Sequence, residues 1–174
     1  MRAGRLRTRR LRTRRLRAAE VERAHAILVA ASRALAAAGF PNWDPPYPLW
    51  RMRAEAVSRE IWLVEQRGRP IGTYTVTTRP PHRYPATCFA RGVRSLYLNR
   101  LAVMPAHWGG GLGSALMAQV EERARAVGAR AIRFDAFRDN APLRAFYRRL
   151  GYVERGPFAV GPIPVVCFEK ELSP

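Results

Sequence analysis

Four of the five residues from 109 to 113 are glycines, and they lie directly before a segment with helical periodicity. Glycine has no Cβ, so successive backbone N–H groups can curve around an anion and adopt positive φ angles. A helix that begins at about Leu112 would add its unpaired first-turn N–H groups and the positive end of its dipole. The turn therefore predicts a pyrophosphate site that needs no basic side chain, and a glycine-rich turn that binds nothing is the alternative.

The familiar phosphate-binding motifs match this turn poorly. A Walker loop needs a lysine after its last glycine, and the only lysine of the chain is Lys170. A dinucleotide fingerprint needs a third small residue, and Ser114 is the best that the spacing offers. Asp135 lies where a ribose-binding acid would, so a nicotinamide-binding protein stays open as a distant alternative.

A second candidate segment runs from Asn140 to Tyr152. Asn140 is a natural N-cap and Pro142 suits the first turn of a helix. The spacing predicts a buried stripe of Leu143, Phe146 and Leu150, with Tyr147 at its edge. An ordinary helix aromatic with its hydroxyl in water would give the same pattern.

The elements that must position these segments follow from periodicity and from glycine and proline breaks. Helices are expected at Val21–Leu35, Leu49–Arg59, Leu112–Val127 and Ala141–Leu150. Strands are expected at Arg15–Ala18, Ile61–Glu65, Ile71–Thr78, Leu96–Val103, Ala131–Ala136 and Val165–Leu172. This order indicates an α/β protein with antiparallel strands first and a βαβ crossover at its centre.

Taken together, the motifs resemble the GCN5-related N-acetyltransferase (GNAT) superfamily. The resemblance rests on Leu98–Val103, Trp108–Gly113, Asn140 and Phe146–Tyr152. It implies an α/β fold of the α+β type, in which about four helices flank a twisted, mixed and mostly antiparallel sheet of about six to seven strands. It also implies a single domain over residues 15–174.

The activity that the resemblance implies is an acetyl-CoA-dependent N-acetyltransferase. An acetyl group would pass from acetyl-CoA to a primary amine of a small molecule or peptide by direct attack in a ternary complex, without a metal. Tyr147 would be the catalytic acid. The implied cofactor-binding residues are Leu101, Ala102, Val103, Trp108, Gly109, Gly110, Gly111, Leu112, Gly113, Ser114, Asn140 and Tyr147.

Two positions depart from the family pattern. Trp108 stands where the turn commonly begins with Arg or Gln, which removes a charged contact but leaves the backbone amides. Asn99 and Arg100 stand where many relatives carry the acid that deprotonates the amine. The base is therefore left open among Asp135, His107, His82 and Asp44, or the amine arrives deprotonated.

The acceptor pocket is expected beside a proline- and aromatic-rich connection and near the central strands. Its candidate residues are Trp43, Asp44, Tyr47, Asn99 and Asp135. The loop over residues 80–94 adds His82, Tyr84, Cys88 and Phe89. Aromatic walls with one acid would suit an amine with an apolar or planar body, and the alternative is that these aromatics only seal a helix pair.

The formal net charge of +18 is concentrated at the N-terminus, because residues 1–17 hold nine arginines and no acid. Tandem five-residue repeats begin at Arg5, Arg10 and Arg15, and a period of five gathers no apolar face on a helix or a strand. We therefore expect residues 1–14 to form a disordered tail. The alternative function is a non-catalytic CoA-sensing or nucleic-acid-binding module that uses this tail. A nucleic-acid partner is not expected, because charge alone specifies only solubility and non-specific contacts.

The lengths of the apolar runs and the spacing of the cysteines limit the class of protein. No apolar run approaches the roughly 20 residues of a membrane-spanning helix, so a membrane partner is not expected. Cys88 and Cys167 match no metal or redox spacing and are expected to be reduced thiols in a cytoplasmic protein. A homodimer is compatible with the resemblance, but no feature of the sequence indicates one.

Overall fold

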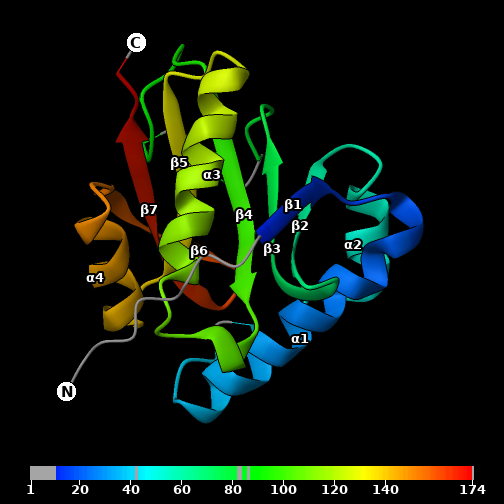
Figure 1. Cartoon of the computed structure of the whole chain (residues 1–174). Coiled ribbons are helices and arrows are strands. Elements are labelled where there is room, and N and C mark those ends of the chain that lie inside the picture. Colours follow the sequence, from blue (N-terminus) through cyan, green and yellow to red (C-terminus); the bar gives the residue numbers. More distant parts are fainter. Residues whose placement is uncertain (1–10, 42, 82–83, 86, 174) are drawn as a thin grey trace, which may run out of the picture. The chain divides into compact units, whose positions relative to one another are not determined.

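Seven strands form one mixed sheet in the order β1-β2-β3-β4-β5-β7-β6, and Figure 1 shows the elements in a computed structural model. The structure describes residues 11–41, 43–81, 84, 85 and 87–173. The strands are β1 (Leu11–Arg15), β2 (Glu60–Gln66), β3 (Arg69–Thr77), β4 (Ser95–Val103), β5 (Ala131–Phe137), β6 (Val153–Val160) and β7 (Ile163–Glu171). The helices are α1 (Val21–Ala37), α2 (Leu49–Glu55), α3 (Leu112–Ala126) and α4 (Ala141–Arg149), with short 3-10 turns η1 (Ala18–Glu20) and η2 (Pro105–His107). None of the described helices is long and apolar enough to cross a membrane.

The fold class expected from the sequence is confirmed. Strands β4 and β5 are parallel and are joined through α3, whereas β1 pairs with β2, β5 with β7 and β6 with β7 in antiparallel ladders. The turn at Arg67 and Gly68 joins β2 to β3, and both residues have positive φ, as a tight hairpin requires. The crossover that the sequence predicted is therefore present.

Strand β6 was not predicted. Its sequence contains Gly156 and Pro157, which usually interrupt strands, and its register with β7 shifts between Glu154 and Gly156. A bulge accommodates such residues at low cost, because the ladder continues on both sides of it. The alternating burial of β6 is typical of a strand with one face exposed.

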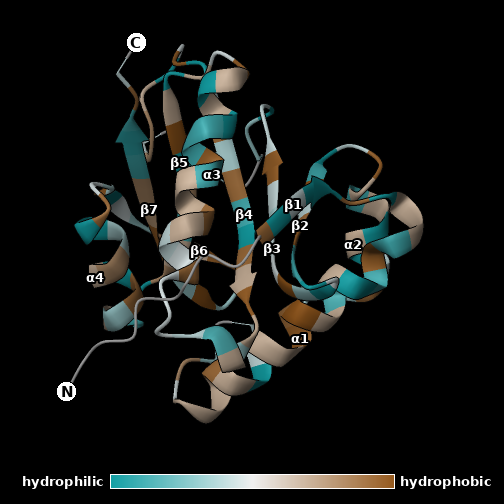
Figure 2. Cartoon of the chain, viewed as in Figure 1, coloured by the Kyte–Doolittle hydropathy of each residue, from teal (hydrophilic) through white to brown (hydrophobic). Residues whose placement is uncertain are grey.

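The chain divides into two compact units. The first unit contains the described residues up to Thr75 together with Arg100–Leu116, and the second contains Val76–Asn99 and the residues from Met117 onward. The core of the first unit is built from the apolar stripe of α1 with residues of α2, β2 and β4: Leu16, Val21, Ala24, Ile27, Leu28, Ala31, Met52, Ile61, Leu63 and Ala102. The core of the second unit includes an aromatic cluster of Phe134, Tyr147, Tyr152 and Phe168. In Figure 2 hydrophobic residues appear along α1 and within β4 and β5.

The expectation of a disordered tail over residues 1–14 is wrong for residues 11–14. These residues belong to β1, which pairs with β2 from Leu11↔Gln66 to Arg15↔Trp62. The first strand therefore begins earlier than the expected start at Arg15. Residues 1–10, which contain the first copy of the repeat, lie outside the described part of the chain.

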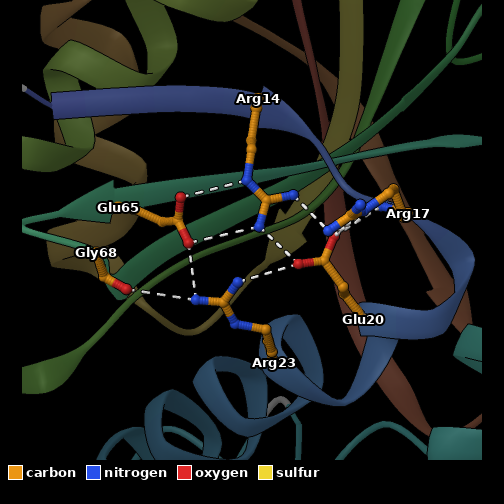
Figure 3. A network of polar contacts seen from close by, with 6 residues as sticks. All are labelled: Arg14, Arg17, Glu20, Arg23, Glu65 and Gly68. Carbon is orange, nitrogen blue, oxygen red and sulfur yellow. Dashed lines mark hydrogen bonds and ion pairs between the residues drawn. The ribbon is translucent and has the colours of Figure 1, made fainter.

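Ion pairs explain why an arginine-rich segment becomes a strand. Arg14 contacts Glu20 at 2.7 Å and Glu65 at 3.3 Å, and Arg23 contacts Glu65 at 2.7 Å and Glu20 at 3.1 Å. Figure 3 shows these groups with Arg17, which adds a further contact to Glu20 at 3.1 Å. The two carboxylates thus join β1, η1, α1 and β2, and they neutralise arginines that would repel one another in an isolated segment.

The carboxyl groups of this network are held in their charged form. Burial would raise the pKa of Glu65, but hydrogen bonds and charges from Arg14 and Arg23 outweigh it and lower that pKa overall. Hydrogen bonds from Arg14, Arg17 and Arg23 lower the pKa of Glu20. Both carboxylates are therefore ionised at neutral pH.

Candidate active site

The glycine-rich turn follows the end of β4 in the first unit. The N–H of Met104 donates to the carbonyl oxygen of Ile71 at 2.9 Å, and the η2 turn then leads into residues 108–111. Gly109 and Gly111 have φ angles of 73° and 81°, a region that side chains with a Cβ rarely adopt. A Cβ built on either glycine would meet nothing within 4 Å, so the space next to them is open. These two glycines are therefore required by backbone conformation rather than by a close neighbour.

The backbone of this turn can bind an anion. Helix α3 begins at Leu112, as expected, so the N–H groups of its first turn have no helical carbonyl to donate to. They stand at the positive end of the helix dipole, directly after two positive-φ glycines. The open space, the amides and the helix start together fit a pyrophosphate.

Trp108 fastens the turn to the strand. Its indole Nε1 donates to the carbonyl oxygen of Val103 at 2.9 Å, while 44% of the residue is exposed. The sequence indicated only that Trp108 lacks the charge common at this position. The structure gives it a positioning role, because the hydrogen bond fixes the turn relative to the end of β4.

Replacing Gly111 by alanine should weaken acetyl-CoA binding about tenfold. Alanine at φ 81° is strained by about 1–2 kcal/mol, and the turn can relieve that strain only by rotating the peptides that carry the amides. Isothermal titration calorimetry would measure the Kd. Gly39→Ala is the matched control, because Gly39 follows α1 with φ 86° and equally open surroundings. An equal loss of affinity in both variants would show that general destabilisation, not the turn, is responsible.

Helix α4 of the second unit carries the other expected functional segment. The Asn140 side chain caps the helix, since its Oδ1 accepts from the N–H of Leu143 at 3.0 Å, and Asn140 itself is buried. The expected burial pattern is wrong, because Tyr147 is the buried residue of α4, whereas Leu143 and Phe146 are only partly buried. The reason is tertiary: the Tyr147 ring packs against Phe134 at 4.6 Å and against other aromatics of the second unit.

The Tyr147 hydroxyl is suited to carry a proton. Burial raises the pKa of Tyr147, and the negative charge of Asp135 raises it further. The hydroxyl therefore stays protonated at neutral pH, which a proton donor requires.

Asp135 of β5 is joined to a loop that the sequence could not place. The Tyr84 hydroxyl donates to Asp135 Oδ1 at 2.6 Å, and the Tyr84 ring packs against Tyr97 of β4 and Phe158 of β6. Because Asp135 also acts on the pKa of Tyr147, these groups form one connected set within the second unit. Among the base candidates in the described part of the chain, Asp135 is the one whose charge acts on the pKa of Tyr147.

A second cluster, in the first unit, was not anticipated. Arg100 has φ 50° within β4, forms an ion pair with Glu55 of α2 and lies 4.4 Å from the ring centroid of Tyr47. The Tyr47 hydroxyl donates to Glu55 Oε1 at 3.0 Å. Burial lowers the pKa of Arg100, and the charge of Glu55 opposes that effect. Residue types alone gave no signal for a positive φ at an arginine or for these contacts.

The remaining expected site residues divide between the two units. Trp43, Asp44 and Tyr47 belong to the first unit, where Trp43 and Tyr47 pack against the α1 core. His107 also lies in the first unit, whereas Asn99 lies buried in the second with Asp135. His82 lies outside the described residues. Within the described part of the chain, no group of three or more His, Cys, Asp and Glu residues gathers as a metal site would require.

Comparison with known proteins assigns the family. Residues 29–152 match the model of the acetyltransferase (GNAT) family, and this range includes β4, the glycine turn, α3, β5 and α4. An IAA acetyltransferase of Azospirillum brasilense is 38% identical over 77 residues, or 43% of this chain and 50% of that protein. An uncharacterized N-acetyltransferase, YesJ, of Bacillus subtilis is 38% identical over 79 residues, or 45% of this chain and 42% of that protein. The chain thus spans half the length of these curated relatives or less.

Solved structures share the fold at low sequence identity. A GNAT-family acetyltransferase of Listeria monocytogenes matches with a TM-score of 0.76 and 20% identity, over 93% of this chain and 95% of that one. A PaiA N-acetyltransferase of Thermoplasma acidophilum, solved with coenzyme A, matches with a TM-score of 0.70 and 16% identity, over 94% of this chain and 99% of that one. Together with the family match, which covers well over half of the sequence, these likenesses establish that the chain belongs to the GNAT acetyltransferase family.

Proposed function

We propose that the protein transfers an acetyl group from acetyl-CoA to a primary amine, by direct attack within a ternary complex. The observation that carries the proposal is the turn at Gly109–Gly111, whose positive-φ glycines lead into the first-turn amides of α3 inside the matched family segment. A coenzyme A complex of a protein with the same fold supports the choice of donor.

Each binding step has residues suited to it. The amides of Gly109 to Ser114 would hold the pyrophosphate. The backbone of Leu101, Ala102 and Val103 would bind the pantetheine arm, and Asn140 would contact the same region. Acetyl-CoA would supply a thioester, whose C–S bond breaks as the amine nitrogen forms a C–N bond to the carbonyl carbon.

The proton balance assigns two further roles. Tyr147 would protonate the departing thiolate, a role for which its buried hydroxyl is present in the protonated form at neutral pH. Asp135 would receive the proton that the amine loses, directly or through water, since it is the carboxylate that acts on Tyr147. With the acyl group held beside Tyr147 and Asp135, the protein would further accelerate the reaction by orienting the amine.

Acetyl-CoA should raise the melting temperature of the protein. A ligand at 100 times its Kd stabilises the native state by about 2.7 kcal/mol, which corresponds to a rise of about 5–10 °C for a chain of this size. Differential scanning fluorimetry measures the shift. NAD is the matched control, since it also carries a pyrophosphate but lacks the pantetheine arm, and it should leave the melting temperature unchanged.

Absence of a shift with acetyl-, propionyl- and succinyl-CoA would contradict the proposal. A shift with NAD alone would favour the nicotinamide alternative. The nucleic-acid alternative is not favoured, because Arg14 of the basic segment is engaged by Glu20 and Glu65 and β1 lies in the sheet.

A further inference from the structure

A pocket of about 360 Å³ lies in the second unit, between the β3–β4 connection and the sheet. Its aromatic walls are Tyr84, Phe89 and Tyr97, and its charged lining residues are Arg91, Arg94 and Arg133. Every lining residue belongs to the described part of the second unit, and none of them is acidic. The pocket therefore combines flat apolar walls with an excess of positive charge.

The aromatic walls are held in fixed positions. The Tyr84 ring stands edge-on to Phe89 at 5.3 Å and stacks on Tyr97 at 6.1 Å. The guanidinium carbon of Arg133 lies 4.9 Å from the ring centroid of Phe89. Such rings present broad flat faces, which favour a planar apolar body over a flexible polar one.

The excess positive charge of the pocket lies at Arg91 and Arg94, because the charge of Arg133 is paired with Glu169. Arg133 is 3% exposed and donates to Glu169 Oε1 at 2.7 Å and to the carbonyl oxygen of Ala90 at 3.0 Å. Glu169 also accepts from Arg155 at 2.7 Å, and Arg155 has a second carboxylate partner in Glu171 at 3.7 Å. Within the described part of the chain, no ion pair involves Arg91 or Arg94. An anionic group in the pocket would offset the remaining charge, whereas a cationic group would add to it.

Tyr84 connects the pocket to Asp135, the proposed base. Tyr84 lines the pocket and donates to Asp135, the carboxylate that acts on Tyr147. Arg133 and Asp135 are two residues apart on β5 and therefore lie on the same face, about 7 Å apart along the strand. A negative group thus stands at one end of this face and positive groups at the other.

We propose that this pocket binds the distal part of the acceptor, and that the acceptor is an amine whose planar body carries a carboxylate. The amine would lie beside Asp135, the planar body beside Tyr84 and Phe89, and the carboxylate among the arginines. This inference rests on the proposed acetyl transfer and adds the substrate class. It also disfavours polyamines, which would place a cation among Arg91, Arg94 and Arg133.

Three amines that share a benzylamine group and differ in the para substituent test the proposal. 4-(Aminomethyl)benzoate carries the carboxylate, benzylamine lacks it, and p-xylylenediamine replaces it with a cation. The rate of CoA thiol release gives kcat/KM for each. We expect 4-(aminomethyl)benzoate to be preferred over benzylamine at least about tenfold, and p-xylylenediamine to be the poorest.

Arg91→Ala should reduce that preference severalfold, by lowering kcat/KM for 4-(aminomethyl)benzoate more than for benzylamine. Arg91 is exposed at the pocket, so the variant should fold. Arg33→Ala is the control, since it removes the same charge from the exposed side of α1 in the first unit and should change neither rate.

Binding of 4-methylbenzoate, which has no amine, separates this inference from the catalytic proposal. Titration calorimetry should detect binding to the wild type and a loss of at least about fivefold in Arg91→Ala. Equal use of benzylamine, a preference for the diamine, or no binding of 4-methylbenzoate would overturn the pocket assignment while acetyl transfer still stands. If no amine is acetylated, binding of 4-methylbenzoate that depends on Arg91 still supports the pocket, and only the transfer proposal fails.

Discussion

Replacing Tyr147 by phenylalanine should lower kcat by at least about 100-fold and change the Kd for acetyl-CoA by no more than about threefold. The substitution removes one hydroxyl and keeps the ring that packs on Phe134 and Phe168. A general acid contributes roughly 100- to 10,000-fold to a rate, and no other group in the proposed mechanism protonates the thiolate. Stopped-flow measurement of CoA thiol release with the best amine gives kcat, and calorimetry gives the Kd.

Tyr152→Phe is the matched control for that experiment. Tyr152 belongs to the same aromatic cluster, and its hydroxyl donates to Glu121 at 3.2 Å. Loss of this buried hydrogen bond should lower the free energy of unfolding by about 1 kcal/mol and leave kcat within about threefold. If Tyr147→Phe keeps the wild-type kcat, Tyr147 is not the acid and the thiolate leaves unassisted or is protonated by water.

Replacing Glu65 by glutamine should destabilise the fold by about 2 kcal/mol, or about 4–8 °C in melting temperature. Glu65 is 5% exposed and accepts from both Arg14 and Arg23, so the neutral amide would leave two guanidinium groups in partly buried positions without their second partner. Urea denaturation measures the loss. Glu22→Gln is the control, since the Glu22–Arg53 pair is exposed and the free energy of unfolding should not change measurably.

The contribution of Glu65 should depend on pH in a defined direction. The pKa of Glu65 is lower in the folded protein than its usual value of about 4.3, so its charged form stabilises the fold at every pH above that value. The stabilisation is lost as pH falls through the lowered pKa, because the folded protein must then take up a proton. The stability difference between wild type and Glu65→Gln should therefore be full at pH 7 and shrink below about pH 4. A difference that stays constant down to pH 2.5 would show that the network acts through packing rather than charge.

Strand β1 was placed by long-range pairing that its local sequence pattern did not reveal. The repeat in residues 5–19 has a period that matches neither a helix nor a strand, so local reasoning predicted disorder up to residue 14. What places residues 11–14 in the sheet is the pairing with β2 and the contacts of Arg14 with Glu20 and Glu65, which lie 6 and 51 positions away. Interactions between residues that distant leave no periodic signal in a single sequence.

In the candidate site too, some features follow from local sequence and others only from tertiary contacts. The glycine turn and the start of α3 could be predicted, because glycine content, the helix start and backbone amide geometry are local properties of the chain. The capping by Asn140 was equally local and is confirmed. The burial of Tyr147 could not be predicted locally, since it depends on contacts with Phe134 of β5 and Phe168 of β7.

By itself, the sequence determined the family, the crossover from β4 through α3 to β5, and the glycine turn with positive φ angles before α3. These follow from short-range spacing, which the chain carries in contiguous segments. The tertiary structure alone decided that Tyr84 meets Asp135, that Arg100 is clamped against Tyr47 and Glu55, and that arginines line an aromatic pocket. Each of these depends on side chains from separate elements meeting at distances of a few ångströms, and only the folded arrangement of strands and loops sets those distances.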